Sequence, residues 1–266
     1  MSKETMRRLF DESPGASLGA IDRGAVYADL RLGHAIPDHR PYVVINMVAT
    51  VDGKVVIGGP GTTRLIGSRT DHLLMTRIEG QCDAVLFGAT LMREDDPGYP
   101  FHDEARQARR IARGVRPEPL WVGLTTRAEF PRIPRMFEGG PTRTALFSGS
   151  GIATATRETL AAVTSLTVAD TPEVSLTTML HALRHDHGVR VLCCLGGPAV
   201  NAAMLHSGVV DEVFCTVAPK IHAGRGGVTM FEGEPYPAEA LPRLDLAAVH
   251  VEESEVYLRY RIRHAT

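Results

Sequence analysis

Short aliphatic runs that end in glycine or proline alternate along this chain with segments whose apolar residues recur at helical spacing. The runs at 83–88, 189–195 and 211–219 are clear examples. Runs of this kind are typical of strands that are buried on both faces of a sheet. Strands that alternate with helices build a sheet that is mostly parallel and flanked by helices. The sequence therefore predicts an α/β fold.

The individual elements are expected from the same patterns. Strands are expected at 42–51, 83–88, 120–125, 144–148, 165–169, 189–195 and 211–219. Helices are expected from Ser68 to Gly80, at about 154–163, from Ser175 to about His187, and from Pro198 to Gly208. The tail at 244–263 alternates in its second half, which predicts a C-terminal antiparallel hairpin at the edge of the sheet.

Residues 1–40 differ from the rest of the chain. They are polar, and any long element is interrupted by Pro14, Gly15, Gly19, Gly24, Gly33 and Pro37. We interpret this segment as an N-terminal extension that wraps on the domain or on a partner subunit. A length of 266 residues suits one α/β domain with such an appendage. The domain itself is expected to cover 41–266.

Composition argues against several classes of function. A net charge of −2 favours neither nucleic acid nor an anionic membrane as a partner. No apolar run approaches the ~20 residues that span a bilayer, and the first residues hold no apolar export signal. The four cysteines, Cys82, Cys193, Cys194 and Cys215, lack C-x-x-C spacing and predict buried, reduced thiols. We expect a cytoplasmic protein.

One arginine-rich segment, DEARQARRIARGVR at 103–116, predicts a short basic helix with a thin apolar face. An arm that binds nucleic acid is one interpretation. In a net-acidic chain we favour a solvated excursion from the domain.

A pair of glycines, Gly196 and Gly197, directly follows the strand expected at 189–195, and Pro198 then opens a helix. Glycine lets the backbone approach a ligand closely, and the free amides and dipole of a helix start attract an anion. The same pattern also suits a tight turn with no ligand, so both interpretations stay open.

A second turn of the same kind lies at FGATLM, 87–92, where a buried strand ends in Gly88. The common nucleotide-binding fingerprints, such as GxxxxGK[ST], are absent from the sequence. Two glycine turns at the carboxyl ends of two strands indicate one extended ligand, for example a dinucleotide.

Four segments together resemble one known family. They are RPYVVINMVATVDGKV at 40–55, LIGS at 65–68, DAVLFGATLMREDDP at 83–97 and LGGPAVNAAMLHSGVVDEVFCTVAPKIHAG at 195–224. In order and spacing they resemble the pyrimidine reductases of riboflavin biosynthesis, which comprise the RibD C-terminal domain and the archaeal and fungal reductases. The resemblance covers about 40–260 and implies a dihydrofolate-reductase-like fold. It also implies NADPH-dependent reduction of a ribosylamino-pyrimidine 5′-phosphate to its ribitylamino form.

Two further features refine the resemblance. The zinc deaminase motifs that precede this domain in many bacterial members are absent, which implies a stand-alone reductase module. Asn46 stands where the bifunctional bacterial proteins have lysine, so the chain is more similar to the archaeal and fungal reductases.

The resemblance implies roles for individual residues. The implied cofactor contacts are Val48, Ala49, Leu65, Gly88, Leu91, Asp95, Thr125, Gly196, Gly197, Pro198, Ala199, Val200 and Asn201. The implied substrate contacts are Asn46, Asp52, Thr63 and the residue at position 195. Asp95 and Asp96 are the expected catalytic residues, since a carboxylate can hydrogen-bond the substrate or stabilise developing positive charge. No metal site is implied.

Two positions depart from the family pattern. The family has glutamate before the two glycines, where this chain has Leu195, a side chain that accepts no hydrogen bond. An arginine expected to hold the substrate phosphate is replaced by Glu79, although Arg77 is near in sequence. Three alternatives therefore remain: the family substrate, another small substrate such as a pterin, and a nucleotide-binding protein without turnover.

Several of these candidate residues also have an alternative, purely structural interpretation. Asp52 with Gly53 would also form a turn, as would Asp95 and Asp96 before Pro97. His181, His185 and His187 have a spacing that suits a metal but is also ordinary at a helix end. Pairing of edge strands or of residues 1–40 makes a homodimer plausible.

Overall fold

The computed structural model describes residues 5–59, 65–98 and 103–264. The chain divides into two compact units. The first, which we call the terminal unit, comprises 1–31, 43–78 and 198–266. The second, the central unit, comprises 32–42 and 79–197.

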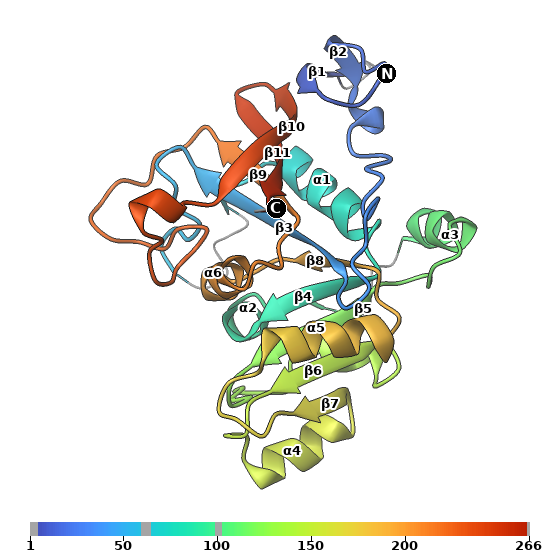
Figure 1. Ribbon diagram of the computed structural model, residues 1–266, viewed down its shortest axis with the longest axis vertical. Coiled ribbons are helices and arrows are strands. Elements are labelled where there is room, and N and C mark those ends of the chain that lie inside the picture. Colours follow the sequence, from blue (N-terminus) through green and yellow to red (C-terminus); the bar gives the residue numbers. More distant parts are fainter. Residues whose placement is uncertain (1–4, 60–64, 99–102, 265–266) are drawn as a thin grey trace. The chain divides into compact units, whose positions relative to one another are not determined.

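The central unit is built on five parallel strands (Figure 1). Their order across the sheet is β8 (Val191–Cys194), β4 (Ala84–Gly88), β5 (Leu120–Thr125), β6 (Thr144–Ser148) and β7 (Ser165–Val168). The helices of this unit are α2 (Ala89–Glu94), α3 (Glu104–Ala112), α4 (Thr154–Ala161) and α5 (Leu176–His185), with a 3-10 turn at Arg135–Gly139. All five strands were predicted, and β5 and β6 have the predicted bounds.

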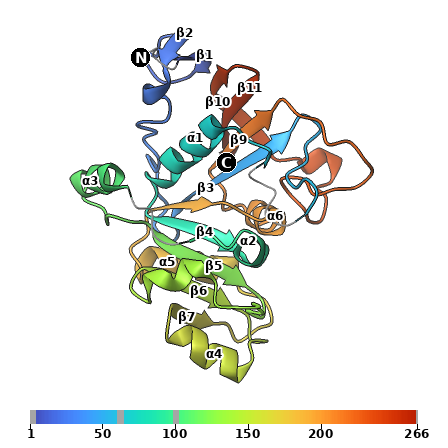
Figure 2. The same cartoon turned by 180° about the vertical axis from the view of Figure 1, so that it is seen from behind.

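The central sheet is buried because its strands are almost entirely apolar. Every residue of β4 and β8 is buried. Helix α5 crosses in front of β5 and β6 in Figure 1 and behind them in Figure 2, so it covers one face. Ser175 caps this helix by accepting a hydrogen bond from the Thr178 amide, and the helix buries Met179, Leu180 and Leu183. Burial on both faces explains the uninterrupted aliphatic runs.

The terminal unit holds the remaining strands in the order β2 (Gly19–Asp22), β1 (Thr5–Asp11), β10 (Arg243–Glu252), β11 (Glu255–Arg263), β9 (Glu212–Ala218) and β3 (Tyr42–Thr50). All neighbours are antiparallel except β9 and β3, which are parallel. Its helices are α1 (Arg69–Glu79) and α6 (Pro198–His206). The predicted C-terminal hairpin and the predicted α/β fold are confirmed.

The N-terminal segment contributes two strands that were not among the expected elements. β1 pairs with β10, and the Arg8 side chain donates to the His250 ring at 3.4 Å. Three of the seven residues of β1 are charged, so neither alternation nor an apolar run marks it as a strand. The domain boundary at residue 40 and a contact of this segment with a partner subunit stay predictions.

Most of residues 103–116 are exposed, as expected of a solvated excursion. Helix α3 forms as expected, but it buries Arg106 and Arg110, and Arg110 is only 1% exposed. The Arg110 guanidinium donates to the carbonyl oxygens of Gly80, Cys82 and Arg116 at 2.6–3.0 Å. The buried face of α3 thus holds two arginines, Arg110 donating to backbone carbonyls and Arg106 lying beside acidic groups such as Glu79, which an apolar pattern does not reveal.

The four cysteines are all free and buried, as predicted. No helix within the described ranges combines the length and the apolar character that crossing a membrane requires.

Candidate functional site

The two predicted glycine turns lie side by side at the carboxyl ends of β8 and β4. The Leu195 amide donates to the Leu86 carbonyl at 3.0 Å, and the Gly88 amide donates to the Gly196 carbonyl at 2.6 Å. Gly196 has a φ of +88°, a conformation that favours glycine. In open parallel sheets, ligands bind outside the carboxyl ends of the strands. This edge of the central unit is therefore the candidate site.

Gly197 has no packing reason to be glycine. A Cβ atom built on it meets no described atom within 4 Å, and its φ is not in the left-handed region. Gly149 provides a contrast, because a Cβ there would overlap the carbonyl oxygen of Pro172. Open space where a Cβ atom would stand fits the close approach of a ligand.

The helix after β4 brings Leu91, Asp95 and Asp96 to the same edge. The amides of both aspartates donate to the Leu91 carbonyl, at 3.0 and 3.3 Å. The Asp96 carboxylate accepts from the Arg132 guanidinium at 2.6 Å and from the Arg135 amide at 2.9 Å. Asp96 thus uses both carboxylate oxygens to hold a neighbouring loop, while Asp95 is half-buried beside it.

Thr125, at the end of β5, is buried and closes a turn. Its hydroxyl accepts a hydrogen bond from the Ala128 amide at 3.0 Å, and its carbonyl accepts from the Gly149 amide at 3.1 Å. This side chain shapes the loop that follows β5.

In the terminal unit, β3 carries three of the candidates. Asn46 and Val48 are half-buried and, two residues apart on a strand, lie on one face of the sheet. Ala49 is 1% exposed and lies on the other face. Asn46 and Val48 are the β3 candidates that the strand leaves accessible to a ligand.

Asp52 holds the loop that follows β3. Its Oδ1 accepts from the Thr50 hydroxyl at 2.7 Å and from the His222 amide at 3.1 Å, and its Oδ2 accepts from the Ala223 amide at 2.9 Å. These hydrogen bonds, that of Thr50 first, lower the pKa of Asp52 to about 2. Asp52 is therefore ionised at neutral pH and joins two loops.

The remaining candidates of the terminal unit have different surroundings. Leu65 is 62% exposed. On α6, Ala199 is exposed and Pro198 and Val200 are half-buried, whereas Asn201 is fully buried and donates to the Met230 carbonyl at 3.0 Å. Asn201 therefore anchors α6 through its side chain. Thr63 lies outside the described residues.

Glu79 is not placed to repel a ligand phosphate. It is 2% exposed and lies inside the central unit, where the guanidinium of Arg106 is its charged neighbour. Burial raises the pKa of Glu79 to about 7, and Arg106 opposes part of this rise.

One titratable group of the terminal unit was missed by the sequence reasoning. Asp71, in the first turn of α1, is half-buried, and burial raises its pKa to about 6. An acidic residue in the first turn of a helix is ordinary, so the sequence offered no signal.

The histidines of α5 show no metal cluster. The rings of His181 and His185 lie 4.3 Å apart between centroids. Within the parts of the chain that the structure describes, no group of three or more His, Cys, Asp or Glu side chains is arranged to hold a metal ion.

Comparison with known proteins identifies relatives. Residues 41–258 match the family model described as the RibD C-terminal domain. The chain is 28% identical over 226 residues to the 2,5-diamino-6-ribosylamino-4(3H)-pyrimidinone 5′-phosphate reductase of Methanothermobacter thermautotrophicus, covering 84% of this chain and 99% of that protein. It is 27% identical over 197 residues to the reductase of the same name from Archaeoglobus fulgidus, covering 74% of this chain and 89% of that protein.

The fold has solved counterparts. A crystal structure of a pyrimidine reductase-like protein from Corynebacterium diphtheriae superimposes with a TM-score of 0.73, at 17% identity, over 88% of this chain and 98% of that chain. The match of the family model to most of the chain, together with this likeness of fold, shows that the protein belongs to the RibD C-terminal domain family, as an oxidoreductase with a dihydrofolate-reductase-like fold.

Proposed function

We propose that the protein reduces a ribosylamino-pyrimidine 5′-phosphate to the ribitylamino form, with NADPH as the hydride donor. The observation that carries this proposal is the similarity to the archaeal reductase along 99% of that relative's length. The open space beside Gly197, at the carboxyl ends of parallel strands, supports a dinucleotide cofactor.

In this proposal the cofactor lies against the glycine turns. The backbone from Gly196 to Asn201 would hold the pyrophosphate, because glycines and a helix start expose amides to an anion. Val48 and Leu65 would flank the nicotinamide. The remaining cofactor contacts would be Ala49, Gly88, Leu91, Asp95 and Thr125, of which Ala49 and Thr125 act through the backbone or by shaping the site, since their side chains are buried.

The substrate would be held by Asn46, whose amide offers both donors and an acceptor, with Asp52 and Thr63 as further contacts. Of the two predicted catalytic carboxylates, Asp95 is the better candidate for the substrate, because Asp96 is engaged by Arg132 and Arg135. These side chains would orient the acceptor carbon and exclude water, while the cofactor supplies the hydride when bound.

The test is a reductase assay on the purified protein. The ribosylamino-pyrimidine phosphate is offered with NADPH or NADH, and both nicotinamide oxidation and the ribitylamino product are measured. Product formation with a preference for NADPH supports the proposal. Nicotinamide binding without any product from this substrate contradicts it.

A second candidate is favoured by one observation. Leu195 is half-buried directly before the glycine turn and offers no hydrogen-bond acceptor to a pyrimidine. Reduction of a different small heterocycle, such as a pterin, is therefore the alternative, and the same assay with a panel of pterins distinguishes it.

A further inference from the structure

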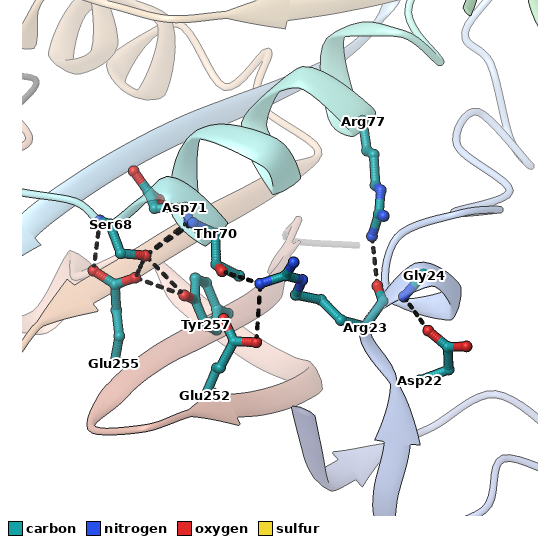
Figure 3. A network of polar contacts seen from close by, with 10 residues as sticks. All are labelled: Asp22, Arg23, Gly24, Ser68, Thr70, Asp71, Arg77, Glu252, Glu255 and Tyr257. Carbon is teal, nitrogen blue, oxygen red and sulfur yellow. Dashed lines mark hydrogen bonds and ion pairs between the residues drawn. The ribbon is translucent and has the colours of Figure 1, made fainter. Parts of the chain in front are cut away.

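Asp71 is held in place by a network of hydrogen bonds at the start of α1 (Figure 3). The Ser68 hydroxyl accepts the backbone amides of Thr70 and Asp71, both at 3.1 Å. Ser68 is fixed in turn by the Glu255 carboxylate, which also accepts from the Tyr257 hydroxyl at 2.6 Å. The backbone of Asp71 is therefore fixed by the Ser68 cap, and its carboxyl group takes no part in this network.

The carboxyl group of Asp71 has polar neighbours but no cation. It accepts a hydrogen bond from the Thr216 hydroxyl on β9, and within the described ranges it forms no ion pair. Its Oδ2 occupies the space where a side chain at Gly67 would lie. The glycine at 67 thus makes room for this carboxyl group.

Burial and the groups around Asp71 explain the raised pKa of its carboxyl group. Burial raises its pKa to about 6, the Thr216 hydrogen bond lowers it, and the Glu255 carboxylate raises it. The nearby Cys215 thiol has its own pKa raised by burial to about 11, so it stays neutral near pH 7. Asp71 is the group of this cluster that exchanges a proton with a midpoint near pH 6.

Asp71 lies over the sheet face that carries two of the proposed ligand contacts. In the parallel pair β9–β3, Thr216 is the register partner of Val48, and Phe214 is the partner of Asn46. Register partners in neighbouring strands project to the same face. The Asp71 carboxyl group, which is hydrogen-bonded to Thr216, therefore lies on the same face of the sheet as Asn46 and Val48 inside the terminal unit.

We propose that Asp71 is a further catalytic residue, the general acid that protonates the substrate as it is reduced. This inference rests on the proposed function, in which the ring-opened sugar presents a carbon–nitrogen double bond. The hydride brings two electrons to the ribosyl carbon. The π electron pair of the double bond takes the carboxyl proton of Asp71 onto nitrogen. Asp71 is left as a carboxylate, which solvent reprotonates.

Three other acids fit this role less well. A general acid works best when its pKa lies near the operating pH. The hydrogen bonds to Asp52 lower its pKa to about 2, so it is ionised. Asp96 is ion-paired with Arg132. Glu79 holds a proton near pH 7 but is enclosed in the central unit beside Arg106.

The test compares Asp71→Asn with Asp245→Asn, a matched change at an exposed aspartate that pairs with Arg263. With the ribosylamino-pyrimidine phosphate and NADPH, we expect Asp71→Asn to lower kcat by about 100-fold, the usual contribution of general acid catalysis. Binding of the ribitylamino product, measured by calorimetry, should change far less than kcat. Asp245→Asn should retain wild-type turnover.

The pH dependence separates catalysis from support of the fold. In the wild type, kcat should fall as pH rises through the pKa of Asp71, and this limb should be absent in Asp71→Asn. Thr216→Val removes the hydrogen bond that lowers the pKa, so it should move the limb to higher pH. Asp71→Asn with wild-type kcat, or Thr216→Val with an unmoved limb, overturns the inference and leaves the proposed function intact. A wild type that forms no product overturns both.

Discussion

Arg259 and Glu212 form a two-pronged ion pair inside the antiparallel part of the terminal unit. The Arg259 Nε lies 2.7 Å from one Glu212 carboxylate oxygen, and its Nη2 lies 2.9 Å from the other. The Glu212 side chain is 0% exposed and that of Arg259 is 11% exposed. The pair joins β9 to β11, and Arg259 also donates to the Leu30 carbonyl.

Breaking this pair should destabilise the fold strongly. Arg259→Met leaves a buried carboxylate without its main partner, and such changes cost about 3–5 kcal/mol. Urea denaturation followed by circular dichroism measures the loss. Arg263→Met is the matched control, because its pair with Asp245 is exposed and such pairs contribute little to stability. Equal losses in the two variants would contradict a special role for the buried pair.

Substitution of two glycines should separate ligand binding from packing. Gly197→Val should strongly weaken NADPH binding, because its side chain would fill space in which a Cβ atom meets no described atom within 4 Å. Gly149→Ala should instead lower the melting temperature, because its Cβ overlaps the Pro172 carbonyl. Fluorescence titration with NADPH and thermal melts of both variants provide the check. Unchanged affinity in Gly197→Val would mean that the glycine pair is only a turn.

Leu195→Glu restores the acceptor that the family places before the glycines. If the absence of this acceptor lowers activity on the pyrimidine substrate, Leu195→Glu should raise that activity. The expected gain is about 10-fold, for a hydrogen bond worth about 1.5 kcal/mol. Steady-state kinetics of the variant and of the isosteric Leu195→Gln test this. No gain in either variant would show that leucine at 195 does not limit this substrate.

Stability should fall in acid through His250. Burial, followed by the charge of Arg8, lowers the pKa of this histidine from 6.5 to about 4. Between pH 6.5 and about 4, His250 is therefore protonated in the unfolded chain and neutral in the folded chain. Its contribution to stability is complete above about pH 6.5 and is lost as pH falls toward 4.

The measurement is the free energy of unfolding between pH 4 and 8. His250→Gln keeps a polar side chain without titration and should flatten the curve over the window from about 6.5 to 4. An unchanged slope in that variant would assign the acid sensitivity to other groups.

The aliphatic strands were predictable because burial on both faces leaves a strong local signal. β5 and β6 appear at the predicted bounds, and the turn at Gly196 lies beside the turn at Gly88 as expected of carboxyl strand ends. β1 was not predictable, since its place depends on pairing with β10, more than 230 residues away in sequence. The burial of Arg110 depends on carbonyl groups that no residue pattern displays.

The candidate site was predictable in part, because glycine turns and strand ends are visible in a few consecutive residues. Both predicted glycine turns lie at this edge of the sheet. Some carboxylates are already hydrogen-bonded within the protein, and their partners are distant in the sequence. Arg132 donates to Asp96, and the His222 amide donates to Asp52. Burial and the hydrogen bond from Thr216, on another strand, determine the pKa of Asp71, and neither is visible in the residues next to Asp71 in the sequence.

The pairing of β1 with β10 also affects how much of the edge of the sheet is exposed to other molecules. β10 is ten residues long, β1 pairs with its residues 248–251, and the sheet finishes at β2, which has four residues. A short terminal strand offers little template for another chain. We expect a version trimmed to begin at residue 41 to leave residues 248–251 of β10 uncovered and to be more prone to edge-to-edge association.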